Sequence, residues 1–105
     1  MKKISIILVS LCLAFSSLSF AKGDKKAGKI LAKTCTGCHG ENGISVNPDW
    51  PNLAGQQYGY LVKQIKAFRD VKKPGARKNP LMNSVVSQLS DLEVNNLAAY
   101  FNSLK

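Results

Sequence analysis

The residues in this chain best suited to chemistry are two cysteines and a histidine that lie close together: Cys35, Cys38 and His39. His39 is the only histidine in the sequence, and the one other cysteine, Cys12, lies in an apolar stretch near the amino terminus. A Cys-x-x-Cys pair can bind zinc or exchange thiols, and when a histidine follows directly it can anchor a haem covalently. The rest of the sequence favours one of these three chemistries.

Covalent haem attachment fits the sequence best. A structural zinc site usually takes its four ligands from two separated Cys/His pairs, and no second pair follows this one. A thioredoxin-like dithiol lies at a strand-to-helix junction of a β-α-β unit, but runs of alternating β-branched residues are almost missing downstream. We therefore predict that Cys35 and Cys38 form thioethers to the porphyrin and that His39 ligates the iron.

A second axial ligand is predicted at Met82, the only methionine after the amino-terminal segment. It lies in the proline-containing segment KNPLMN (78–83), which is predicted to form a loop across the far face of the ring. A lone methionine is usually a core residue. Here a thioether would suit the iron, pair with the histidine and raise the reduction potential. Filling the sixth coordination site favours electron transfer over catalysis.

Residues 1–21 are predicted to form a cleaved secretory signal peptide. Lys2 and Lys3 precede an apolar stretch, and Ser19-Phe20-Ala21 forms a small-x-small cleavage site. The alternative is an uncleaved membrane anchor, because the apolar stretch over 4–20 is close to the lower limit of about 17 residues for a spanning helix. Cleavage would leave residues 22–105 as one small domain in the periplasm, and domains of this size often depend on a disulfide, metal or cofactor for stability.

Helical periodicity predicts three helices separated by long loops. The first covers 25–35, the second covers 58–71 and ends before Pro74-Gly75, and the third follows a capping box at Ser90 and Glu93. The loop over 40–55 is long for a small domain and is expected to wrap a ligand. The residues predicted to form the apolar helix faces are Ala27, Ile30, Leu31, Leu61, Val62, Ile65, Phe68, Val94, Leu97, Ala98 and Phe101.

Taken in order, these segments resemble the small class I bacterial cytochromes c, including single units of the two-domain dihaem cytochromes. The resemblance covers nearly all of residues 24–105 and is carried by CTGCHG (35–40), WPNLAGQ (50–56), YL to FR (60–69), NPLM (79–82) and LAAYF (97–101). It implies an all-α class I cytochrome c fold, with three to four short helices and long loops around one haem c. It also implies thioethers at Cys35 and Cys38 and axial ligation by His39 and Met82.

The resemblance assigns further roles around the haem. The carbonyl of Pro51, twelve residues after His39, would accept a hydrogen bond from the imidazole and fix its orientation. From the donor chemistry of their side chains, and not from the resemblance, Trp50 and Arg77 are predicted to contact the haem propionates.

In the family, the first and last helices cross near the haem edge. Many relatives have a glycine eight residues before the first cysteine, where this chain has Ala27 with Gly28 beside it. The resemblance would therefore pack Ala27 and Leu31 against Leu97 and Tyr100.

The chain after residue 21 is basic, with 13 Lys and Arg residues against 6 Asp and Glu. Secretion removes the opportunity to bind nucleic acid. Basic residues gather instead before Met82, where they would steer an acidic partner to the haem edge or simply form a solvated surface. These residues are Lys72, Lys73, Arg77 and Lys78.

The predicted function is that of a periplasmic electron carrier between larger redox proteins. It would act as a monomer or weak dimer, with no small-molecule substrate. One alternative is a haem enzyme or a sensor of gas or peroxide, in which Met82 leaves the iron. Another is a haem subunit fixed in a larger complex.

Overall fold

The computed structural model describes residues 23–104, and within them all regular structure is helical. A 3-10 turn, η2 (Ala32–Thr34), joins the first two helices. The helices are α1 (Lys25–Leu31), α2 (Thr36–His39), α3 (Tyr58–Arg69), α4 (Pro80–Val86) and α5 (Asp91–Ser103). The predicted all-α fold is confirmed, whereas the predicted signal peptide lies outside the described residues. Within residues 23–104, no helix is long and apolar enough to cross a membrane.

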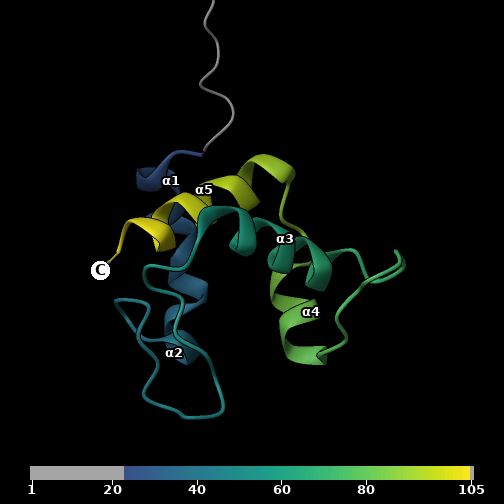
Figure 1. The fold of residues 1–105 in the computed structure, drawn as a ribbon, viewed down its shortest axis with the longest axis horizontal. Coiled ribbons are helices and arrows are strands. Elements are labelled where there is room, and N and C mark those ends of the chain that lie inside the picture. Colours follow the sequence, from purple (N-terminus) through teal and green to yellow (C-terminus); the bar gives the residue numbers. More distant parts are fainter. Residues whose placement is uncertain (1–22, 105) are drawn as a thin grey trace, which may run out of the picture.

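Helix α5 forms the centre of the core, with α1 and α3 packed against it (Figure 1). Its predicted capping box is present: the Ser90 hydroxyl accepts from the Glu93 amide, and the Glu93 carboxylate accepts from the Ser90 amide, both at 3.0 Å. These bonds satisfy two donors at the start of the helix. The predicted apolar face of α5 is buried, and it consists of Val94, Leu97, Ala98 and Phe101.

The close crossing of α1 and α5 occurs at Gly28, not at the predicted Ala27. Gly28 is buried, and a Cβ there would overlap the backbone carbonyl of Asn96. The prediction of Ile30 as a core residue was also wrong, because its side chain is 68% exposed. Two residues correspond to about 200° around a helix, so Ile30 faces away from the Gly28 contact. Leu31 and Tyr100 do pack against the core, as expected.

Replacing Gly28 with alanine is expected to destabilise the holoprotein by about 1 to 3 kcal/mol. Alanine gains up to about 1 kcal/mol of helix propensity over glycine, but the overlap with α5 forces the two helices apart. Gly59→Ala in α3 is the matched control, because a Cβ at Gly59 meets nothing within 4 Å. Thermal unfolding measures both variants. Equal stability changes in the two would refute the helix-crossing argument.

Helix α4 occupies the segment predicted to be a loop around Met82. Asn79 caps it, because its Oδ1 accepts a hydrogen bond from the Met82 amide at 3.1 Å, and Pro80 follows in the first helical position. An asparagine cap and an early proline both favour a helix start. The loop prediction was therefore wrong. With α4 and the four-residue α2, the described part of the chain has five α-helices, above the three to four expected.

The loop over 40–55 folds back on itself beneath α2. Gly40 ends α2 with a φ of +90°, which favours glycine. The Gly43 carbonyl accepts from the amides of Leu53 and Ala54, at 2.8 and 3.0 Å, and so closes the loop. The Gly55 amide then donates to the last turn of α5. These bonds return the Trp50-Pro51 segment to the vicinity of His39.

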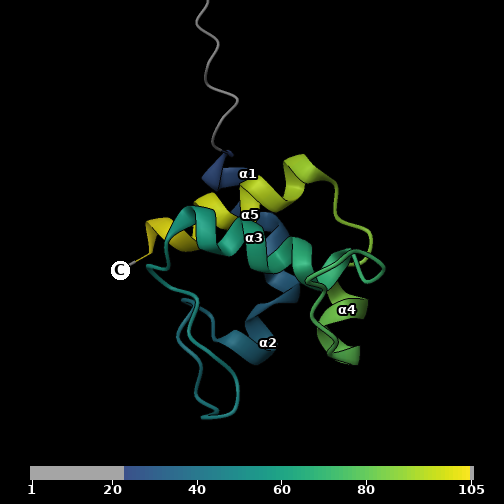
Figure 2. The ribbon, with the colours of Figure 1, turned by 45° about the vertical axis from the view of Figure 1, so that its right-hand side comes forward.

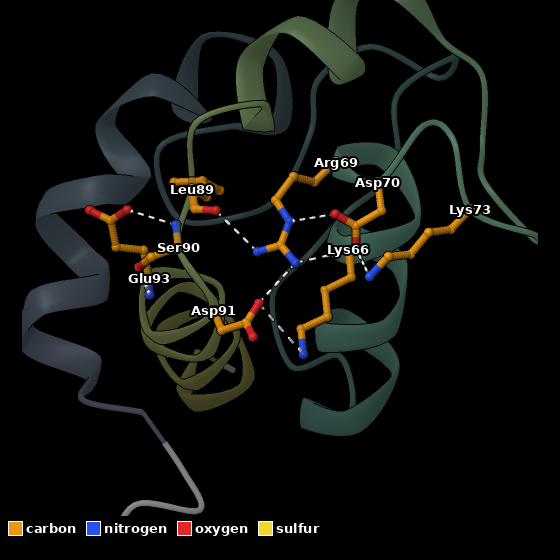
Figure 3. A network of polar contacts seen from close by, with 8 residues as sticks. All are labelled: Lys66, Arg69, Asp70, Lys73, Leu89, Ser90, Asp91 and Glu93. Carbon is orange, nitrogen blue, oxygen red and sulfur yellow. Dashed lines mark hydrogen bonds and ion pairs between the residues drawn. The ribbon is translucent and has the colours of Figure 1, made fainter.

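A polar cluster fixes the chain on either side of α4 (Figure 3). At the end of α3, the Arg69 guanidinium donates to the Leu89 carbonyl at 3.0 Å and lies 2.8 Å from an Asp91 oxygen at the start of α5. Hydrogen bonds from Arg69 hold the pKa of Asp70 and of Asp91 below the ordinary carboxyl value. The cluster therefore stabilises the fold at pH values above the ordinary carboxyl pKa. This stabilisation is lost as the pH falls through the lowered pKa values of Asp70 and Asp91.

Candidate functional site

A cavity of about 520 Å³ lies among α2, the 40–55 loop, α3, α4 and α5. Its volume falls within the range of roughly 300 to 1,000 Å³ typical of ligand sites, and its lining is mostly apolar. Helices α2 and α4 stand on opposite sides of this region in both ribbon views (Figures 1 and 2). All predicted site residues line the cavity: Cys35, Cys38, His39, Trp50, Pro51, Arg77 and Met82.

His39 is held in one orientation by the folded-back loop. Its side chain is buried, and its Nδ1 lies 2.7 Å from the Pro51 carbonyl oxygen. Because a carbonyl can only accept, Nδ1 donates this hydrogen bond, and in the neutral imidazole Nε2 is the nitrogen with the free lone pair. This contact is the one that the predicted role of Pro51 requires. A buried imidazole with a fixed tautomer is suited to binding a metal.

The two cysteines lie one helical turn apart on the same wall as His39. The amides of Cys38 and His39 both donate to the Cys35 carbonyl, at 3.2 and 2.9 Å, and both thiols are free and half-buried. Burial raises the pKa of the Cys35 thiol, with the Thr34 hydroxyl acting in the opposite sense. Dithiol exchange needs a thiol with a lowered pKa. The raised pKa of Cys35 therefore does not favour thiol exchange at this residue.

Met82 lies in the first turn of α4, and its side chain is half-buried. Helices α2 and α4, which carry His39 and Met82, stand across from each other (Figures 1 and 2), and both residues line the cavity. A cofactor held in this cavity would be offered a nitrogen donor by His39 and a sulfur donor by Met82.

Arg77 and Trp50 line the cavity as well. The Arg77 guanidinium donates to Gln64 Oε1 at 2.8 Å, and its central carbon lies 4.3 Å from the centre of the Phe68 ring. These contacts leave several Arg77 donors for an anionic group. Trp50 is 39% exposed. Their predicted contacts with propionates stay predictions.

Sequence reasoning missed part of the cavity wall. Phe68 was predicted as a core residue of α3, but it lines the cavity together with Gln64, Leu81 and Val85. A helix face that contacts an apolar cofactor has the same periodicity as one that contacts the core. The signal in the sequence was Gln64, a polar residue one turn before Phe68 on that face, because a face packed only against the core would be apolar there.

The residues present fit a c-type haem. Two thiols, an imidazole and a soft thioether line one apolar cavity, and these are the donors that would hold a covalently attached, six-coordinate haem. The small helical fold and this site together define a c-type haem protein.

Comparison with known proteins identifies the family. The family model described as cytochrome c matches residues 25–105, and the chain belongs to this family. The predicted resemblance is thereby confirmed, and the cofactor of the domain is haem c.

This chain is similar both to relatives about twice its length and to a shorter relative. It is 39% identical over 106 residues to cytochrome c4 of Azotobacter vinelandii, and the alignment covers 96% of this chain and 50% of the relative. It is 41% identical over 81 residues to cytochrome c-554(548) of Halomonas halodenitrificans, and this alignment covers 77% of this chain and 96% of the relative. The chain thus spans about half the length of its cytochrome c4 relatives and nearly the full length of the shorter one.

A solved structure supports the same assignment. The crystal structure of reduced recombinant cytochrome c4 from Pseudomonas stutzeri aligns with a TM-score of 0.72 and 40% identity. The alignment covers 79% of this chain and 46% of that chain. This chain therefore has the fold of one part of that longer protein.

Proposed function

We propose that this protein is a periplasmic one-electron carrier, with thioethers at Cys35 and Cys38 and axial ligands His39 and Met82. The observation that carries the proposal is that the fixed imidazole of His39 and the thioether of Met82 line the same apolar cavity as the two cysteines. When bound, haem iron supplies one-electron exchange between its ferrous and ferric states. The mature protein would begin at residue 22 and act as a monomer or weak dimer.

The residues of the chain serve to keep the site unchanged when the electron arrives. The Pro51 carbonyl holds the imidazole plane and makes His39 a stronger donor. The Met82 thioether favours the ferrous state and so raises the reduction potential. Retaining both ligands keeps structural rearrangement small. This arrangement suits a protein that must accept and release electrons quickly.

The surroundings of Met82 favour a carrier over a haem enzyme or sensor. An enzyme acting on peroxide needs an acid-base group near the open coordination site. The nearby amide side chains of Asn79 and Asn83 are already engaged with backbone groups. They hold the chain together, so they are poorly placed to serve as proton donors to a bound ligand.

The connection between α3 and α4 offers a docking surface for an acidic redox partner. Lys72, Lys73 and Lys78 are exposed there, and the neighbouring Arg77 lines the cavity. Lys73 has one carboxylate partner, Asp70, at 3.7 Å, and is itself 74% exposed. Pairs so exposed contribute little binding energy and leave the charge available for steering. The partners would be larger redox proteins with acidic surfaces, bound only transiently.

Replacing Lys72 and Lys78 with glutamine is expected to slow electron exchange with an acidic flavoprotein by about tenfold at low ionic strength. The reason is that long-range attraction raises the encounter rate, and the difference should vanish in high salt. The matched control is Lys25→Gln with Lys29→Gln, which removes the same charge from α1, outside the cavity wall. Stopped-flow kinetics measures the rates. If the two double variants slow electron exchange equally, the rate depends on net charge alone and the docking surface is refuted.

A further inference from the structure

The side chain of Asn83, directly after Met82, joins three separate segments of the chain. Its Nδ2 donates to the Phe68 carbonyl at 2.7 Å and to the Arg77 carbonyl at 2.9 Å. Its Oδ1 accepts from the Asn79 amide at 2.9 Å. One amide group therefore links the last turn of α3, the end of the α3–α4 connection and the start of α4.

These bonds reach Met82 through one further contact. Asn79 Oδ1 accepts from the Met82 amide at 3.1 Å, so Asn79 and Asn83 fix the first turn of α4 from both sides. The Phe68 carbonyl belongs to the last turn of α3, where carbonyls lack partners within the helix. The backbone of Met82 is thus attached to the cavity wall that α3 provides.

The apolar residues of α4 do not all serve the protein core. Val86, at the far end of α4, is buried, whereas Leu81 and Val85 line the cavity, where they would contact the cofactor. The Arg69 cluster also acts beyond the far end of α4, through the Leu89 carbonyl and Asp91. Asn83 therefore provides the main polar attachment on the side of α4 that carries Met82.

We propose that Asn83 is a positioning residue that keeps Met82 on the iron against competing ligands. The inference rests on the proposed function, because it takes Met82 to be the distal ligand. Without Asn83, the first turn of α4 loses its bonds to Phe68 and Arg77, and the thioether can move away from the cavity more easily.

Imidazole added to the oxidised holoprotein tests this role. It competes with the thioether, and its binding removes the sulfur-to-iron charge-transfer band. We expect Asn83→Ala to lower the imidazole concentration for half-displacement by about tenfold, because the two hydrogen bonds to backbone carbonyls and the one from the Asn79 amide are all lost. Asn83→Ser, a milder change that keeps a donor, should give a smaller shift in the same direction.

Asn102→Ala is the matched control, because Asn102 Nδ2 also donates to a backbone carbonyl, that of Gln56 at 2.8 Å, on the exposed side of α5. Thermal unfolding of each variant measures general loss of stability. An imidazole shift in the Asn83 variants with none in Asn102→Ala supports the positioning role. Wild-type behaviour of both Asn83 variants, or equal shifts in all three, overturns it. If the wild-type protein lacks the charge-transfer band, Met82 is not the ligand, and the proposed ligation fails along with this inference.

Discussion

Replacing Cys35 and Cys38 together with serine is expected to abolish covalent haem and to leave the exported chain largely unfolded. Serine cannot form the two thioethers. Within residues 23–104, only seven hydrophobic residues are buried, and a cavity of about 520 Å³ lies beside them. A small domain with so limited a core depends on its cofactor for stability, as small metal-binding domains depend on their metal.

Two measurements check this expectation on the exported protein. Haem staining of a denaturing gel reports covalent attachment, and far-ultraviolet circular dichroism reports helix content. Cys12→Ser is the control, since Cys12 belongs to the predicted signal peptide and its loss should leave haem content unchanged. A double serine variant that kept wild-type helix content without haem would contradict the view that the cofactor completes the core.

Replacing Met82 with alanine is expected to open the distal coordination site while leaving the haem attached. The reduction potential should fall by roughly 0.1 V or more, since axial ligands set haem potentials over a span of about 0.8 V. The reduced variant should then bind carbon monoxide. Leu81→Ala is the matched control, because Leu81 also lines the cavity and begins the same helix but has no ligating atom.

Spectroelectrochemistry and carbon monoxide titration measure the two effects. A Met82→Ala protein with an unchanged potential and no carbon monoxide binding would assign the distal ligand to another residue. If Leu81→Ala changed the potential as much as Met82→Ala, the shift would come from altered solvent access to the cavity, not from loss of a ligand.

Local sequence signals predicted the last helix and singled out Cys35, Cys38 and His39, which line one cavity. The Cys35 to His39 motif fits within one turn of chain, and the capping box of Ser90 and Glu93 needs residues only three positions apart. The Pro51 contact was also foreseen, but through resemblance, because nothing local indicates which carbonyl a loop will bring to His39.

Features that depend on distant contacts were harder to predict. The start of α4 resembles a loop because Asn79 and Pro80 are common in turns as well as at helix starts. The choice between Ala27 and Gly28 depends on how closely α5 approaches, and the periodicity of α1 does not contain that information. The bonds of Asn83 reach backbone carbonyls up to 15 residues away, so no pattern in the sequence marks this residue.

The most direct test of axial ligation by His39 and Met82 is an optical spectrum of the native holoprotein, oxidised and then reduced under carbon monoxide. Two occupied axial positions predict a sulfur-to-iron charge-transfer band in the oxidised protein and a reduced spectrum that carbon monoxide leaves unchanged. Absence of that band, together with ready uptake of carbon monoxide by the reduced native protein, would contradict this ligation. The distal site would then be open, and the chain would be better described as a haem enzyme or sensor.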